Sequence, residues 1–184
     1  MNNINPYEKC PVYKTEHFTL RLVSEDDIED LLVCYSDSKS QSIFDSQNFA
    51  KNLHCNTVEE MAWYVRFWLE EYRNKMYVRF AIVDNKTKKA IGTVEMFNTK
   101  GFLHGRDGGI LRIDLASPYE TVEYLSELLQ LANDNFFELF GAKVIITKGR
   151  PGEAARLAAL SSAGYRPYNC EAREHYYMLS TPQG

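Results

Sequence analysis

The sequence predicts an α/β (α+β) fold in which a mixed, mostly antiparallel sheet of about six to seven strands carries helices on both faces. Three observations predict it. Strand-like and helix-like patterns follow one another in the order β-α-loop-α-β-β-β-α-β-α-β-β. Two strand patterns in the middle of the chain are separated by a polar turn, as in a hairpin. The continuous apolar run at residues 144–146 is typical of a strand buried on both faces.

Length and composition favour one soluble domain covering residues 1–184, with residues 1–15 as an N-terminal extension. The 21 basic and 25 acidic residues leave a net charge of −4, which argues against nucleic acid as a partner. No apolar run approaches the roughly 20 residues that a membrane helix needs. The first residues lack the basic and apolar regions of a secretory signal, so we expect a cytoplasmic protein without a membrane partner.

The four cysteines and four histidines show no metal-ligand spacing. They form neither a C-x-x-C pair nor an H-x-x-x-H pattern. We therefore expect reduced thiols and no metal.

The N-terminal elements begin with Phe18–Val23, where apolar and polar residues alternate as in a strand. Ser24 and Asp27 form an acidic variant of the capping box, and apolar residues at helical spacing follow to Tyr35. The polar, aperiodic stretch 36–56 predicts a long loop with at most one short helical turn.

A second helix is predicted from Thr57 to Arg73, opened by a capping box between Thr57 and Glu60. Its apolar residues are expected on one buried face: Val58, Met61, Val65, Trp68, Leu69 and Tyr72, widened by Trp63, Tyr64 and Phe67.

Three further strands are predicted in the middle of the chain. Tyr77–Val83 and Ala90–Phe97 form the hairpin, and Ile110–Ala116 is the next strand. The stretch 99–109, between the second and third of these strands, contains four glycines and is predicted to be a flexible connection.

Start signals for a third helix stand together at Ser117 as N-cap, Pro118 at the first position and Glu120 at the third. Gly141 is expected to end this helix. The predicted buried residues are Val122, Leu125, Leu129, Ala132, Phe136 and Phe140.

The C-terminal part is predicted to contain strand Lys143–Lys148 and a short helix that ends near Gly164. Two terminal strands, Tyr165–Asn169 and His175–Leu179, complete the sheet.

Several of these segments, taken together, resemble the GNAT N-acetyltransferase superfamily, nearest to its ribosomal-protein and small-amine acetyltransferases. They are Phe18-Thr19-Leu20-Arg21-Leu22, Phe80-Ala81-Ile82-Val83, Ala90-Ile91-Gly92-Thr93-Val94, the passage from Ile110 to Glu127, and Leu160-Ser161-Ser162-Ala163-Gly164-Tyr165. The resemblance extends over about residues 16–180.

The resemblance implies transfer of an acetyl group from acetyl-CoA, as co-substrate, to the amine of a small molecule or of a protein N-terminus. It also allows a homodimer. The co-substrate would lie where the fourth and fifth strands separate, with its diphosphate at the start of the third helix. By this resemblance, the residues expected to bind the co-substrate are Leu115, Ser117, Thr121 and Val122.

The sequence departs from the family pattern at this helix start. Glu120 stands at the position of a basic residue or glutamine, while Glu123 and Leu125 stand at the positions of two glycines. Like charges about 4 Å apart repel by roughly 4 kcal/mol near a protein surface. The predicted Ser117–Glu120 capping box would also occupy N–H donors that a diphosphate needs.

Two other family positions differ as well, because Glu153 stands near an expected asparagine and Leu160 at an expected tyrosine. These departures keep two alternatives open. One is a catalytically inactive protein of this fold that binds a ligand or another protein, and the other is an unrelated α/β domain with the same order of elements.

A second candidate anion site is the turn from Lys148 to Gly152, where two basic residues and two glycines precede a helix. Lys148 and Arg150 are therefore predicted to bind co-substrate phosphate. The alternative is an ordinary turn with solvated basic side chains.

Glu95 and Asp114 interrupt apolar strands and are the candidate catalytic bases, because a carboxylate loses hydration among apolar neighbours. The structural alternatives are an ion pair of Glu95 with Arg112 and hydrogen bonds from a loop to Asp114. A phenolic proton donor could come from the terminal strands, from Tyr165, Tyr168, Tyr176 or Tyr177.

Overall fold

A computed structural model describes residues 5–44, 53–103, 106–170 and 173–181. The chain divides into two compact units. The N-terminal unit comprises the described parts of Tyr7–Glu95 together with Ile113–Tyr119. The C-terminal unit comprises the described parts of Met96–Arg112 and of the chain from Glu120 onward, with Asn5 and Pro6.

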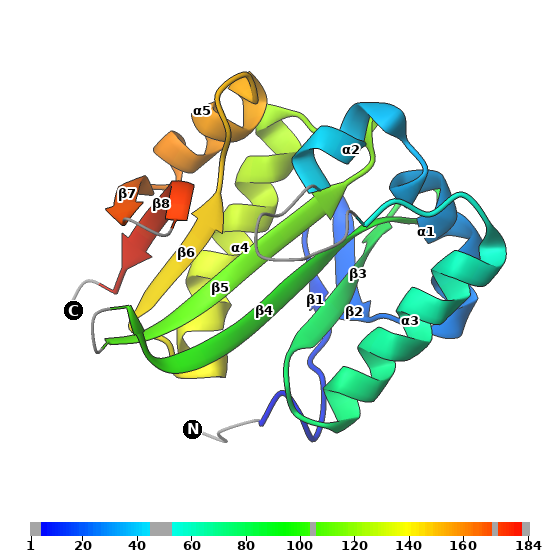
Figure 1. The fold of residues 1–184 in the computed structure, drawn as a ribbon, viewed down its shortest axis with the longest axis horizontal. Coiled ribbons are helices and arrows are strands. Elements are labelled where there is room, and N and C mark those ends of the chain that lie inside the picture. The colour runs from blue at the N-terminus through cyan, green and yellow to red at the C-terminus, as the bar shows by residue number, and fades with distance from the viewer. Residues whose placement is uncertain (1–4, 45–52, 104–105, 171–172, 182–184) are drawn as a thin grey trace. The chain divides into compact units, whose positions relative to one another are not determined.

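The strands form one eight-stranded sheet in the order β1-β2-β3-β4-β5-β6-β8-β7 (Figure 1). Of the pairings with a described register, four are antiparallel and β5–β6 is parallel. The strands are β1 (Tyr13–Lys14), β2 (Phe18–Leu22), β3 (Val78–Asp84), β4 (Ala90–Leu103), β5 (Arg106–Leu115), β6 (Val144–Lys148), β7 (Arg166–Cys170) and β8 (Arg173–Ser180). The predicted mixed, mostly antiparallel sheet is confirmed, with eight strands instead of six to seven.

The N-terminal unit packs helices on residues of strands β3 and β4. Its elements are η1 (Glu25–Asp27), α1 (Ile28–Tyr35), α2 (Ser38–Phe44), α3 (Val58–Arg73) and η2 (Ser117–Tyr119). Helix α3 contacts both α1 and β3. Its buried residues Met61, Val65 and Trp68 join Leu31 and Tyr35 of α1 in one apolar core.

The C-terminal unit contains α4 (Val122–Phe140) and α5 (Ala154–Ser162), which pack against each other. Strand β6 lies between β5 and β8, and residues 144–146 are at most 1% exposed. This confirms the predicted strand buried on both faces. Gly141 ends α4 with a φ of 63°, a conformation that suits glycine.

The capping boxes predicted at Ser24 and at Thr57 are confirmed. Asp27 accepts a hydrogen bond of 2.8 Å from the Ser24 N–H, and the N–H of Glu60 donates to the Thr57 hydroxyl over 3.2 Å. The sequence predicts at most one short helical turn after α1, whereas the structure has α2, a helix of 7 residues, which is about two turns. Residues 45–52 of the predicted loop lie outside the described part of the chain.

The predicted glycine-rich connection at 99–109 is wrong, because β4 continues to Leu103 and β5 begins at Arg106. At Gly109 the glycine meets a packing requirement and does not mark a flexible loop. A Cβ on Gly109 would lie 2.0 Å from Met96 Cε, so glycine leaves room for a neighbouring side chain. Strand β1, which pairs with β2, was not predicted, because a strand of two residues has no recognisable alternation.

The third predicted helix begins four residues later than predicted, at Val122 instead of Pro118. Ser117, Pro118 and Tyr119 form the separate 3-10 turn η2. Thr121 has extended backbone angles, and its hydroxyl accepts from the Tyr124 N–H at the start of α4. The predicted Ser117–Glu120 capping box is therefore wrong, since tertiary contacts hold Ser117 instead.

Two predicted buried faces are narrower than expected. Trp63 and Phe67 of α3 are 60% and 38% exposed, and Val58 is 45% exposed. Val122 of α4 is 44% exposed, whereas the rest of its predicted stripe is buried. Among the helices of the described residues, none has the length and apolar character to cross a membrane.

Candidate functional site

A buried polar cluster joins α1 to three strands within the N-terminal unit. Arg79 of β3 is ion-paired with Glu95 of β4, and its Nη1 lies 3.6 Å from Asp114 Oδ2 of β5. The Tyr35 hydroxyl donates to Asp114 over 2.8 Å. Thr93 accepts from Arg79 over 3.0 Å. The structure thus brings the two predicted bases together, and it does so through an arginine.

Arg79 is the centre of this cluster. It is 2% exposed, and its guanidinium carbon lies 4.2 Å from the centroid of the Trp68 ring. Burial by itself would lower the pKa of Arg79, but the charges of Glu95 and Asp114 and the Tyr35 hydroxyl raise that pKa overall. Arg79 therefore stays charged and offsets carboxylate charge in the core.

The sequence alternatives for these carboxylates are resolved in part. The ion pair described for Glu95 is with Arg79, which lies on the neighbouring strand, and not with the suggested Arg112. Asp114 accepts its described side-chain hydrogen bond from helix α1 and not from a loop. Glu95 and Asp114 therefore share one buried guanidinium as their partner.

Two carboxylates hold the turn η2. Asp37, which lies between α1 and α2, accepts from the Ser117 N–H over 2.9 Å. The Tyr119 hydroxyl donates to Asp84, at the end of β3, over 3.0 Å. Both contacts join residues far apart in the sequence, so they fix η2 against the remainder of the N-terminal unit.

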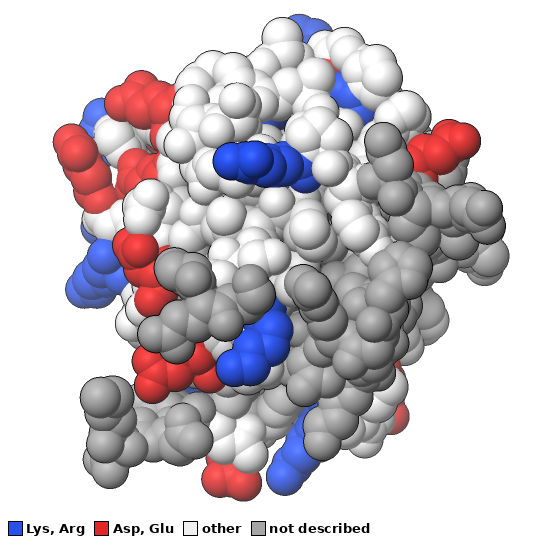
Figure 2. All heavy atoms as spheres, turned by 90° about the vertical axis from the view of Figure 1, so that its left-hand side faces the viewer, with Lys and Arg blue, Asp and Glu red and all other residues white. Residues whose placement is uncertain are grey.

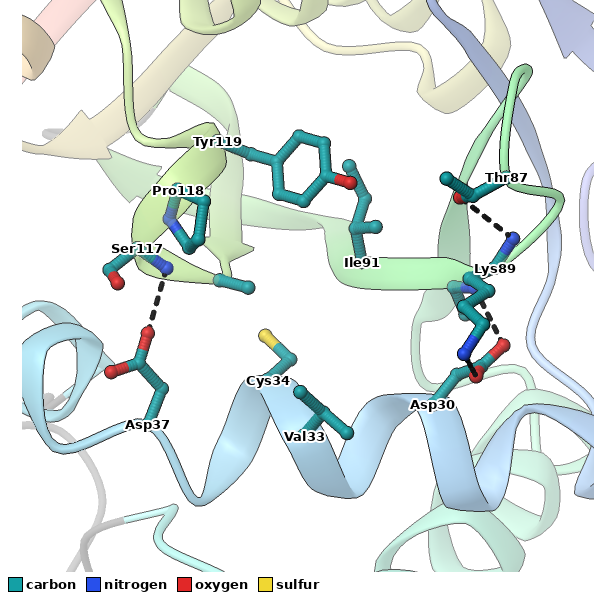
Figure 3. Close-up of a pocket in the computed structure, with 12 residues that line it drawn as sticks. Asp30, Val33, Cys34, Asp37, Thr87, Lys89, Ile91, Ser117, Pro118 and Tyr119 are labelled. Atoms are coloured by element: carbon teal, nitrogen blue, oxygen red, sulfur yellow. Dashed lines mark hydrogen bonds and ion pairs between the residues drawn. The ribbon is translucent and has the colours of Figure 1, made fainter.

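A cavity of about 300 Å³ lies between α1, the start of β4 and η2, all within the N-terminal unit. Figure 3 shows Cys34 and Val33 of α1 on one side and Tyr119 and Ile91 on the other. Asp37 lies at the end next to Ser117 (Figure 3). The cavity is apolar in its middle, with Asp37 at one end and the ion pair of Asp30 and Lys89 at the other.

The two carboxylates that hold η2 predict an acid-sensitive contact. Burial would raise the pKa of Asp37, but hydrogen bonds from Ser117, Lys39 and Ser40 lower it overall. The pKa of Asp84 is likewise lowered, against the effect of burial, by the N–H groups of residues 86 and 87 and by Tyr119.

A pKa that is lower in the folded than in the unfolded state gives stability that is present above pH of about 4 and lost below it. We therefore expect the stability difference between wild type and Asp37→Asn to shrink as pH falls from 6 to 3. Urea unfolding at each pH measures this difference. A difference that stays constant over this range would contradict the assignment.

At the start of α4, the charge of Glu120 is balanced within the C-terminal unit. Arg156 of α5 donates to both carboxylate oxygens of Glu120, over 2.7 and 3.0 Å. The two side chains are 7% and 11% exposed. Glu120 therefore does not present the uncompensated charge that the sequence indicates, whereas Glu123 is exposed in the first turn of α4.

The turn from β6 to α5 packs tightly at Gly149, where a Cβ would lie 2.8 Å from Leu160 Cδ1. Lys148 Nζ lies 5.8 Å from the Tyr176 ring centroid. The Arg150 N–H donates to the Glu153 carboxylate over 2.9 Å. Lys148 and Arg150 thus flank a compact turn just before a helix.

The parallel pairing of β5 and β6 is short. It runs from Gly108↔Val144 to Ile110↔Ile146 and is not continued by the later described residues of either strand. In the resembled family, the co-substrate is expected where two neighbouring strands stop pairing in this way. Of the predicted cofactor residues, Leu115 and Ser117 belong to the N-terminal unit. Thr121, Val122, Lys148 and Arg150 belong to the C-terminal unit.

Tyr165 is 3% exposed, and its hydroxyl donates to Asn133 of α4 over 2.9 Å. Burial raises its pKa, so this phenol holds its proton firmly. Tyr165 therefore fits a packing contact better than a proton donor.

The molecular face in Figure 2 carries acidic and basic side chains interspersed among uncharged residues. In the part of the chain that the structure describes, no three His, Cys, Asp or Glu side chains are grouped as metal ligands would be.

Comparison with known proteins identifies the family. A sequence model described as an acetyltransferase (GNAT) domain matches residues 17–166. The chain belongs to the GNAT acetyltransferase family. This family uses acetyl-CoA. A search of curated proteins found no match.

Solved structures of other GNAT proteins have the same fold at low sequence identity. A ribosomal-protein-S5-alanine acetyltransferase from Vibrio fischeri is 19% identical over 85% of this chain and 83% of its own, with a TM-score of 0.64. A ribosomal L7/L12 alpha-N-protein acetyltransferase in complex with coenzyme A is 14% identical over 92% and 98%, with a TM-score of 0.69. A nucleotide-linked sugar GNAT protein is 15% identical over 96% and 91%, with a TM-score of 0.67.

Sequence reasoning on this GNAT chain missed three residues that organise the two units. Arg79 and Arg156 each balance a buried carboxylate, and Asp37 holds η2. Arg79 could have been noticed, since it interrupts the apolar strand β3 as Glu95 interrupts β4. Arg156 likewise interrupts an Ala/Leu-rich helix, whereas Asp37 lies in a polar stretch that carries no such signal.

Proposed function

We propose that this protein is an N-acetyltransferase that transfers an acetyl group from acetyl-CoA to an amine of a small molecule or a protein N-terminus. The observation that carries the proposal is the match to the acetyltransferase domain over residues 17–166. Similar structures include proteins named for ribosomal-protein and for nucleotide-linked sugar substrates, so both acceptor classes belong to the proposal.

The start of α4 fits an anionic co-substrate. The first turn of a 19-residue helix provides N–H donors and the positive end of its dipole. Val122 is 44% exposed there, and Arg156 balances Glu120. Thr121 and Val122 would hold the diphosphate, with Leu115, Ser117, Lys148 and Arg150 as the other proposed contacts. Acetyl-CoA supplies an activated thioester.

For acceptance of the amine proton, the geometry favours Asp114 over Glu95. Asp114 is 3.6 Å from Arg79, whereas Glu95 is in direct ion-pair contact with it. Asp114 also accepts from the Tyr35 hydroxyl, which can pass on a proton. Glu95 then acts chiefly by holding Arg79.

A second candidate function is a catalytically inactive GNAT-fold module that binds a ligand or a protein. The burial of both candidate bases, which are 3% and 2% exposed, favours it. The absence of glycine between residues 110 and 140 also favours it, because side chains then line the helix start.

Thermal unfolding with CoA and acetyl-CoA separates the candidates. A ligand at 100 times its Kd should stabilise the fold by about 2.7 kcal/mol, or roughly 5–10 °C for a chain of this size. The Lys148→Ala/Arg150→Ala variant should bind at least about fivefold more weakly, because each lost charge costs several tenths of a kcal/mol. Lys9→Ala/Lys14→Ala removes two exposed charges elsewhere and should bind normally.

The outcomes are distinct. No shift at millimolar CoA excludes the acetyltransferase, and a shift without thioester consumption on a panel of amines favours the inactive module. Where turnover occurs, Asp114→Asn should lower kcat without changing the CoA-induced shift. An unchanged kcat removes Asp114 as the base.

A further inference from the structure

Helix α3 exposes an aromatic pair on its outer face. Trp63 is 60% exposed and Phe67 is 38% exposed, while Met61, Val65 and Trp68 of the same helix are at most 2% exposed. The rings of Trp63 and Phe67 are parallel, with centroids 5.4 Å apart and an angle of 1° between planes. Exposure of two large apolar side chains in contact is unfavourable in water and is typical of an interaction surface.

The aromatic pair is held in place from beneath. Tyr64 contacts Trp63 edge to face at 5.0 Å, and it also contacts the buried Trp68 at 6.1 Å between centroids. Because Phe67 and Tyr64 hold the Trp63 ring, Trp63 loses little side-chain freedom when a partner binds. Tryptophan is also the residue most often found to dominate binding energy at interfaces.

Acidic side chains flank this pair along the same helix face. Glu59, Trp63, Phe67 and Glu70 follow at helical spacing and line a shallow groove of about 340 Å³ together with Arg66. We call these five residues the α3 groove. Within the described residues, Glu59 and Glu70 have no ion pair, whereas Arg66 is bound to Glu25 over 3.0 Å. The groove therefore has two unbalanced carboxylates around an aromatic surface.

We propose that the α3 groove binds a cationic peptide segment, one that carries arginine or lysine in an extended chain. A guanidinium or ammonium group over the Trp63 ring gains cation–π attraction, and Glu59 or Glu70 can pair with the same charge. The complementary charge favours this occupant over an acidic or purely apolar segment. The proposal concerns a surface outside the acetyl-transfer residues and does not depend on the proposed function.

Tryptophan fluorescence provides the test, because Trp63 is exposed and the other tryptophan, Trp68, is 2% exposed. The probe is an eight-residue Arg-Gly repeat peptide, with a Glu-Gly repeat of equal length as its control. We expect the Arg-Gly peptide to change Trp63 emission in a saturable manner that weakens with added salt. The Glu-Gly peptide should leave the emission unchanged.

Matched variants locate the site. Trp63→Ala should abolish the emission change, and Glu59→Gln/Glu70→Gln should weaken binding at least fivefold. Glu16→Gln/Glu29→Gln removes the same charge from exposed positions elsewhere in the N-terminal unit and should bind normally. Circular dichroism melts check that each variant is folded, which is expected because these side chains are exposed.

The proposal fails if the Arg-Gly peptide causes no emission change at millimolar concentration, or if the Glu-Gly peptide binds equally well. It also fails if Glu59→Gln/Glu70→Gln and Glu16→Gln/Glu29→Gln weaken binding equally, or if titration calorimetry shows that Trp63→Ala retains binding. A dimer whose formation buries Trp63, seen by light scattering and lost in Trp63→Ala, would also overturn it by assigning the groove to a second copy.

Discussion

Replacement of Arg79 by leucine should lower the free energy of unfolding by about 3–5 kcal/mol, because it removes one partner of a buried ion pair and leaves carboxylates uncompensated. Glu95 and Asp114 are 3% and 2% exposed, so water cannot take over the role of the guanidinium. For a chain of this size, the loss corresponds to a decrease in melting temperature of roughly 6–20 °C.

The matched control is Arg66→Leu. Arg66 is ion-paired with Glu25, but the side chains are 64% and 55% exposed, so the expected loss is below about 1 kcal/mol. The double variant Arg79→Leu/Glu95→Leu should recover part of the loss, since it removes a buried charge along with its partner. Equal losses of unfolding free energy for Arg79→Leu and Arg66→Leu would show that the buried cluster contributes no more to stability than an exposed ion pair.

Replacement of Gly92 by alanine should destabilise the protein by about 3 kcal/mol, near the upper end for overpacked sites. An added Cβ would lie 2.1 Å from the Asp114 carbonyl oxygen and 3.0 Å from Leu115 Cα. Both are backbone atoms, so β4 and β5 would have to move apart. That movement also displaces Asp114 within the buried cluster.

Gly109→Ala is the control for this prediction. Its added Cβ would lie 2.0 Å from Met96 Cε, the end of a flexible side chain that can change rotamer. We expect a loss of about 1 kcal/mol or less there. Denaturant unfolding of the two variants measures the contrast, and a Gly109→Ala loss as large as that of Gly92→Ala would refute the backbone argument.

Most elements could be predicted because their signals are local. The capping boxes at Thr57 and Ser24, the apolar run at 144–146 and the terminating Gly141 involve residues within four positions of each other or a single backbone angle. Such signals act before any tertiary contact forms. The prediction at Ser117 failed because a second capping residue, Thr121, lies close by and Asp37 holds the first.

The candidate site could be predicted only in part. Glu95, Asp114 and Arg79 are each recognisable as charged residues in apolar strands, but their pairing in one buried cluster is not. The acidic start of α4 was recognisable at Glu120, but its compensation by Arg156, 36 residues later in the chain, was not. Charge pairs of this kind leave no periodic pattern in a sequence.

The amino-acid sequence by itself determined the order of most strands and helices and most helix ends, because these follow from periodicity and local hydrogen bonding. Its resemblance in several segments to a known family indicated the acetyltransferase fold. Only the tertiary structure decided which charges are balanced: Arg79 in the N-terminal unit, Arg156 in the C-terminal unit, and the exposed carboxylates of the α3 groove. The physical reason is that a charge finds its partner through space, between segments that the chain brings together only on folding.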